Sequence, residues 1–207
     1  MRRFLATAVG RPWFWVLFVG VGLSLPALRA LTTPAKPPLP VLARVPPFRL
    51  VDQTGQPLSS DALAGRVWVA NFIFTRCPSI CPLFTRKMAK IQDGVRELGN
   101  AIHLVSFTVD PEYDTPPVLT EYAKEHKASP RLWSFLTGDR AELQKTVVDG
   151  LHVHMSKEGD DLMSIGHGGH FVLVDANMQV RGYYDSGEAD AVDRILRDAG
   201  RLMQLGN

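Results

Sequence analysis

Cysteine is scarce in this chain of 207 residues, which contains only two. Scaffolds that stabilise small secreted folds need several disulfide bridges, so that class of protein is excluded. The charges are nearly balanced, with 23 Lys and Arg against 21 Asp and Glu, and they form no long block of one sign. This balance argues against a nucleic-acid partner. No glycine-rich loop of the phosphate-binding kind opens a predicted helix, so we expect no nucleotide site.

The N-terminal region is the most apolar part of the chain. Arg2, Arg3 and Arg11 precede an apolar run from Pro12 to Leu31, which is long enough to cross a hydrocarbon core of roughly 30 Å. Positive charge before such a run predicts a cytoplasmic N-terminus and an exported body. We therefore predict a signal anchor over residues 1–32, single-pass in the cell inner membrane, with the remainder facing the periplasm or another extracytoplasmic space.

A cleaved signal peptide is the alternative interpretation of this region. Its cleavage site would lie near Ala30, but Arg29 fits poorly into the small-residue pattern of such sites. Prolines crowd residues 33–47 and favour an extended, stiff linker. The folded domain is accordingly predicted over residues 48–207.

The rest of the chain alternates between strand and helix patterns. A hairpin is expected around residues 53–56, and the run VWVANFIFT predicts a strand buried on both of its faces. Strands are predicted at 67–75, 102–109 and 131–136, helices at 83–98, from 116 onward and at 139–149, and a terminal hairpin at 171–175 and 180–184 before a helix at 188–202. This order describes an α/β fold, a thioredoxin-like three-layer sandwich with an N-terminal hairpin.

The two cysteines stand in the sequence CPSIC, where a buried strand gives way to a helix. A helix N-terminus favours the thiolate, which is both a nucleophile and a metal ligand. Three residues separate Cys77 from Cys81, so the loop is longer than in Cys-x-x-Cys reductases and could hold two thiolates around a soft ion such as copper(I). A structural disulfide in an oxidising compartment is the competing interpretation.

Candidates for a third ligand lie in the segment SIGHGGHFVLVD. His167 is on a glycine-flanked loop before a predicted strand, and imidazole suits copper. From the residues alone, His170 is nearly as good a candidate for the third ligand. A second stretch with copper-ligand chemistry comprises His152, His154, Met155 and Met163, although such residues are more often loop or core.

The motifs FIFTRCPSICP, SFTVDPEYDTP and FLTG, with a histidine eight residues before Asp175, occur together in this order. The chain from about Phe48 to its C-terminus resembles the Sco/SenC copper proteins of respiratory oxidase assembly. The resemblance implies an anchored thioredoxin-like domain that binds one copper ion, Cu(I) or Cu(II), through Cys77, Cys81 and His167. The family often has Asp-His-Ser where this chain has Gly-His-Gly, which removes polar neighbours of the imidazole.

Asp110 matches a family carboxylate near the metal loop, which would tune thiol acidity or orient a ligand. A turn residue before Pro111 is the simpler interpretation of the same aspartate.

The function implied by the resemblance is a metallochaperone for the copper A site of cytochrome c oxidase. Its expected partners are the copper-bearing oxidase subunit, other periplasmic copper chaperones and the membrane. The alternative is a thiol-disulfide oxidoreductase, with Cys77 and Cys81 as the catalytic pair, that reduces the copper-ligand cysteines of the oxidase. A peroxide-scavenging thioredoxin relative is supported by the fold alone.

Overall fold

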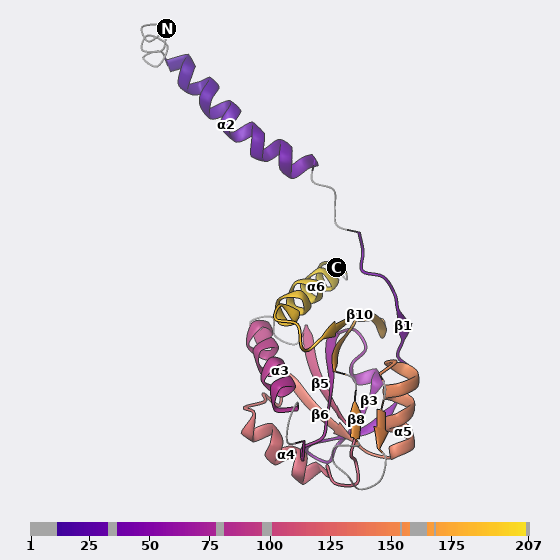
Figure 1. Cartoon of the computed structure of the whole chain (residues 1–207). Coiled ribbons are helices and arrows are strands. Elements are labelled where there is room, and N and C mark those ends of the chain that lie inside the picture. The colour runs from indigo at the N-terminus through magenta and orange to yellow at the C-terminus, as the bar shows by residue number, and fades with distance from the viewer. Residues whose placement is uncertain are drawn as a thin grey trace. The chain divides into compact units, whose positions relative to one another are not determined.

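The computed structural model describes residues 12–32, 37–77, 81–96, 101–153, 155–157, 165–167 and 169–205 (Figure 1). The chain divides into two compact units, residues 1–38 and 39–207. The first contains helix α2 (Pro12–Thr32), and the second contains every described strand and the remaining helices.

Helix α2 carries apolar side chains that are largely exposed within its own unit, among them Val16 and Phe18. Across the described part of the chain, no helix combines the length and the apolarity that a membrane span requires. The membrane anchor therefore stays a prediction, and Arg2, Arg3 and Arg11, on which its orientation depends, lie outside the described residues.

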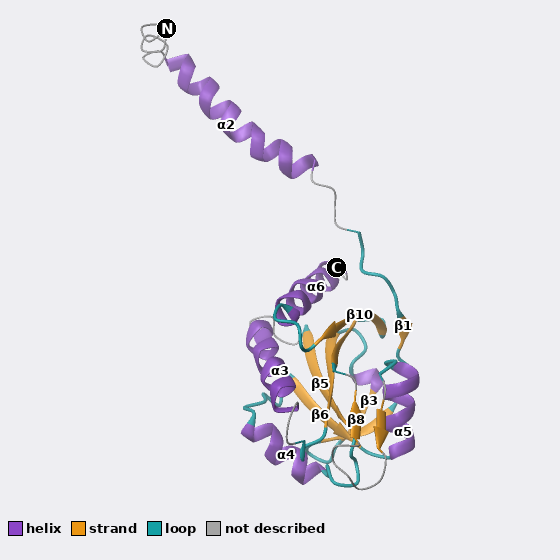
Figure 2. Ribbon diagram, viewed as in Figure 1, coloured by secondary structure: helices purple, strands orange, loops and turns teal. Residues whose placement is uncertain are grey.

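The second unit is built on an eight-stranded sheet in the order β1-β10-β9-β4-β5-β6-β2-β3 (Figure 2). Its strands are β1 (Ala43–Arg44), β2 (Arg49–Asp52), β3 (Pro57–Ser59), β4 (Val67–Ile73), β5 (Ile102–Thr108), β6 (Trp133–Thr137), β9 (His170–Val174) and β10 (Gln179–Asp185). Strands β4, β5 and β6 are parallel, and β9 pairs antiparallel with β4. Every residue of β4 and β5 is buried, as the continuous apolar pattern predicts for central strands.

Helices cover both faces of this sheet. One face packs against α3 (Cys81–Val95), α4 (Pro116–Glu125) and α6 (Ala191–Leu205), which contribute residues such as Ile91, Leu119 and Ile195. The opposite face packs against α5 (Arg140–Gln144) and the π-helix η3 (Lys145–Gly150), through Leu143 and Val147. The three-layer α/β sandwich and its N-terminal hairpin, β2–β3, are thus confirmed.

The linker between the units is shorter than the prolines suggest. Leu42 and Val45 donate backbone hydrogen bonds to Val180 and Met178, and β1 pairs with β10. The side chain of Val45 is buried in the core. Residues 39–47, predicted as linker, therefore belong to the folded unit, because this segment pairs with an otherwise open sheet edge.

A small two-stranded ribbon, β7 (Met155–Lys157) paired with β8 (Ile165–His167), was also not predicted. It places His167 directly across from Met155. The histidine therefore lies at the end of a strand, and not in a free glycine loop.

Candidate metal and thiol site

Cys77 lies in a turn that follows the central strand β4. Its backbone N–H donates to the carbonyl oxygen of Phe74 at 3.1 Å, so Thr75 and Arg76 occupy the two corner positions of a β-turn. The Cys77 side chain is buried, 8% exposed, within the core cluster on the α5 face of the sheet. The first cysteine is thus presented by a turn at the carboxyl end of a buried strand, a frequent position for functional groups in α/β sheets.

Cys81 is the first residue of α3, a helix of 15 residues. The partial positive charge of a helix N-terminus favours a thiolate at this position. Pro82 follows in the first turn, where its missing N–H leaves no intrahelical hydrogen bond unmade. Pro78, Ser79 and Ile80, the residues between the cysteines, lie outside the described residues.

His167 is the last residue of β8, and Gly169, two residues later, lies beside a side chain of the cysteine helix. Gly169 lies against the ring of Phe84 on the first turn of α3, so that a Cβ atom built on the glycine would meet Cζ of Phe84 at 3.4 Å. The carbonyl oxygen of Gly169 accepts a hydrogen bond from Ser186 N at 2.8 Å. This packing places the chain two residues after His167 beside the helix that starts at Cys81.

The sheet register separates His167 from His170. The last paired residues of β4 and β9 are Ala70 and Val172, and the two strands run antiparallel. Moving back from Val172 along the chain therefore advances towards the end of β4 that leads to Cys77. His170, exposed and paired with Asp185, lies in that direction, whereas His167 belongs to the separate ribbon β7–β8, and residue 168 between them lies outside the described residues.

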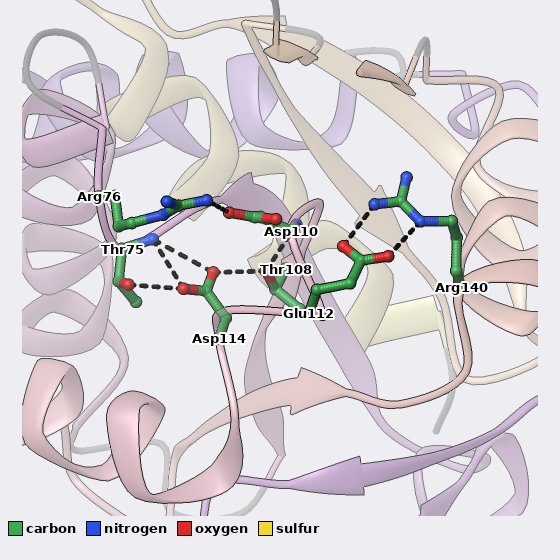
Figure 3. Close-up of polar contacts among 7 residues, drawn as sticks. All are labelled: Thr75, Arg76, Thr108, Asp110, Glu112, Asp114 and Arg140. Atoms are coloured by element: carbon green, nitrogen blue, oxygen red, sulfur yellow. Dashed lines mark hydrogen bonds and ion pairs between the residues drawn. The ribbon is translucent and has the colours of Figure 1, made fainter. Parts of the chain in front are cut away.

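Asp110 and Arg76 form an ion pair next to the cysteine turn (Figure 3). Arg76 Nη2 lies 2.5 Å from Asp110 Oδ2, whose side chain is 0% exposed. The hydrogen bond to Asp110 raises the pKa of Arg76 above its ordinary value. The guanidinium also covers the ring of Tyr113, 4.2 Å from its centroid. Asp110 is thus both a partner of the residue before Cys77 and a turn residue, since its carbonyl oxygen accepts hydrogen bonds from Tyr113 N and Asp114 N.

Asp114 forms a second connection to the same turn and was not predicted. Its buried carboxylate accepts hydrogen bonds from Thr75 N at 3.2 Å, Thr75 Oγ1 at 2.5 Å and Thr108 Oγ1 at 2.5 Å. Thr108 Oγ1 also accepts a hydrogen bond from Asp110 N. Burial raises the pKa of Asp114, and the hydrogen bonds from Thr108 and Thr75 oppose that rise. In sequence, Asp114 reads only as a turn residue of PEYDT.

A surface ion pair extends this network. Glu112 receives two hydrogen bonds from Arg140, at 2.6 and 2.5 Å, a bidentate arrangement that fixes the planes of both groups. The hydrogen bond to Glu112 raises the pKa of Arg140. The Glu112–Arg140 pair links the turn after β5 to the start of α5.

The second histidine and methionine stretch is only partly described. His152 is exposed and has a positive φ of 53°, Met155 begins β7, and His154 and Met163 lie outside the described residues. No group of three or more His, Cys, Asp or Glu residues suited to a metal ion occurs within the described ranges. The ligand set Cys77, Cys81 and His167 therefore stays a prediction.

Comparison with known proteins matches this arrangement to one family. A protein-family model described as SCO1/SenC matches residues 40–204. The chain is 34% identical over 161 residues to the SCO1 protein homolog of Bacillus subtilis, covering 77% of this chain and 82% of the relative.

Two solved structures extend the comparison. BsSco, described as a member of the Sco family of cytochrome c oxidase assembly proteins with a disulfide switch, superposes with a TM-score of 0.72 at 31% identity, covering 83% of this chain and 99% of that structure. ScoI of Arabidopsis thaliana, solved with copper bound, gives a TM-score of 0.66 at 27% identity, covering 77% and 99%.

Proposed function

Because the chain belongs to the SCO1/SenC family, we propose that it binds one copper ion and assists assembly of the copper A site of cytochrome c oxidase. The observation that carries the proposal is the position of the two cysteines, one in the turn after β4 and one at the first residue of α3. Copper bound to the similar ScoI structure, and the oxidase-assembly role stated for BsSco, support it.

Cys77, Cys81 and His167 would hold the ion. Two thiolates and one imidazole form a soft donor set that suits copper. The positive charge of the bound ion would keep both thiols deprotonated. The proximity of Gly169 to Phe84 supports His167, since residue 169, two residues after the histidine, lies beside the cysteine helix. The same donor set can accept Cu(I) or Cu(II), and the ion leaves by stepwise exchange of these ligands for those of the oxidase subunit.

Replacing His167 with alanine is expected to weaken copper binding by more than about tenfold and to shift the thiolate-to-copper absorption band of the Cu(II) form. The physical reason is the loss of one of three ligands. His170→Ala is the matched control, since it removes an imidazole three residues away, and its affinity and spectrum should equal those of the wild type. An altered spectrum for His170→Ala beside an unchanged one for His167→Ala would reverse the ligand assignment.

A thiol-disulfide oxidoreductase is the second candidate function, favoured by the disulfide switch described for BsSco. One thiolate would attack a disulfide of the partner, and the other would resolve the mixed disulfide. The chain would leave oxidised at Cys77 and Cys81, and the partner would leave with two reduced thiols. This activity needs no copper, which separates it from the first candidate.

We further propose that α2 tethers the domain to the inner membrane, with the domain in the periplasm beside the oxidase subunit and other copper chaperones. Exposed apolar residues along α2, including Val16 at 73% and Phe18 at 64%, support a lipid environment. The full chain should remain with membranes after carbonate washing, and a chain starting at Pro37 should be released. Recovery of the full chain in the soluble fraction would contradict the tether.

A further inference from the structure

The turn that ends in Cys77 is held from outside at both of its corner residues. Asp114 binds Thr75, and Asp110 pairs with Arg76. The two contacts differ in kind. Asp110 pairs with the side chain of Arg76, which is itself 34% exposed, whereas Asp114 accepts from the backbone N–H of Thr75 as well as from its hydroxyl. Asp114 therefore constrains the main chain of the turn directly.

The group that holds the turn is itself immobilised. Asp114 is 0% exposed, and its backbone N–H donates to Asp110 O at 2.9 Å. Thr108, the last residue of the central strand β5, donates to the Asp114 carboxylate and accepts from Asp110 N. The hydrogen bonds on Thr75 thus connect it, through Asp114 and Thr108, to the fully buried central strand β5.

Burying a carboxylate between two loops carries a large desolvation free energy. The donors that the described residues supply to Asp114 are all neutral, so no ion pair offsets the cost of removing its charge from water. Apolar packing of similar volume often stabilises a fold as well or better. The carboxylate does provide what apolar contacts lack, since its two oxygens accept several directed hydrogen bonds at once.

We propose that Asp114 is the positioning residue of the cysteine pair, which sets the direction in which the turn presents the Cys77 thiol to a metal ion or to a partner disulfide. This inference rests on the proposed function of Cys77 as a copper ligand or nucleophile. Asp114 does not touch the reacting atoms and acts through Thr75. Asparagine at this position offers one acceptor oxygen and an amide group that cannot accept, so the hydroxyl of either Thr75 or Thr108 can no longer donate to this side chain.

The matched control is Asp175, another buried aspartate, which lies at the opposite end of the sheet. It accepts hydrogen bonds from Asn177 N and Gln179 N and pairs with Arg181 at 2.7 Å. It directly follows Val174, which pairs with Trp68 near the start of β4, whereas Cys77 follows the other end of that strand. Asp175→Asn therefore perturbs the hydrogen bonds of another buried aspartate, one that is also ion-paired, away from the cysteines.

The experiment compares Asp114→Asn with Asp175→Asn in the full chain. Three quantities are measured: the alkylation rate of Cys77 in the reduced, copper-free protein, the rate of copper release, and the urea midpoint. We expect Asp114→Asn to change the alkylation rate by at least about fivefold and to accelerate copper release about 10–100-fold, as for groups that orient metal ligands. Asp175→Asn should leave both rates within about twofold of the wild type, although its urea midpoint falls.

Equal alkylation and release rates in the two variants would overturn the proposal and leave Asp114 a purely structural residue. If Asp114→Asn does not fold, Thr75→Val and Thr75→Ser decide the question, because only valine loses the hydroxyl bond to Asp114; serine should restore both rates. The alkylation rate is read without metal. A wild-type chain that binds no copper would therefore refute the proposed copper function and leave the positioning role of Asp114 measurable.

Discussion

Substitution of either cysteine is expected to abolish stoichiometric copper binding. Cys77→Ser and Cys81→Ser each remove one of two thiolates, and the remaining thiolate and imidazole cannot form the soft three-ligand set. We expect the affinity to fall by more than about 100-fold, beyond the loss typical of changing a group that only supports a ligand. Copper content after gel filtration, measured against protein concentration, checks this result.

The variants at Cys77 need a folding control, because this side chain is buried among apolar residues. A serine hydroxyl there carries a desolvation cost of about 1–3 kcal/mol, whereas Cys77→Ala buries no polar atom. Both variants should lose copper while retaining the circular dichroism spectrum of the wild type. A folded variant that keeps one equivalent of copper would rule out Cys77 as a ligand.

Phe107→Ala is expected to lower the free energy of unfolding by about 3–5 kcal/mol, the largest stability effect that we predict for a single side chain. Phe107 is 0% exposed, and its ring contacts Phe48, Trp68 and Phe72 at centroid distances of 5.9, 6.4 and 6.1 Å. Truncation would leave a cavity among three aromatic rings at the centre of the sheet. Urea denaturation of both proteins measures the difference.

Phe107→Leu is the control for this prediction, since it retains part of the ring volume and should lose distinctly less stability than the alanine variant. The urea m-value should be the same for all three proteins, which would indicate that the same surface is exposed on unfolding. A loss below about 1 kcal/mol for Phe107→Ala would contradict the central role assigned to this ring cluster.

Local patterns were sufficient to predict most of the fold. The apolar run of β4 and the helical spacing of α3 place the cysteine pair at a strand-to-helix junction, as observed. Asp139 caps α5 by accepting hydrogen bonds from Ala141 N and Glu142 N, at the position where the predicted helix begins. These features depend on residues close together in sequence, and sequence patterns report them well.

The predictions that failed depend on local chemistry or on distant contacts. Thr115 precedes α4 and has the residue type of an N-cap, but its side chain makes no capping hydrogen bond. Pro117 occupies the second helical position and so removes one of the two N–H groups that a cap can bind. Strands β1, β7 and β8 are too short to leave a periodic pattern in the sequence. The partner of β1 is β10, which is distant along the chain, and β7 and β8 pair with each other in a separate ribbon.

The residues of the candidate site also divide into those that sequence patterns predict and those that depend on distant contacts. Cys77 and Cys81 are evident from their spacing, and His167 from its distance to Asp175 through the family resemblance. Asp114 was missed, because its importance comes from hydrogen bonds to Thr75, 39 residues earlier in the chain. Contacts between loops at the carboxyl ends of neighbouring parallel strands are set by tertiary structure, which one sequence does not display.

The most direct test of the central claim is a titration of the reduced, metal-free protein with copper, beside the same protein with both thiols alkylated. We predict one tightly bound equivalent for the reduced protein, with a thiolate-to-copper absorption band in the Cu(II) form, and no specific binding after alkylation. Absence of binding by the reduced protein, together with ready cycling of a disulfide between Cys77 and Cys81, would contradict the copper function and favour the thiol-disulfide oxidoreductase.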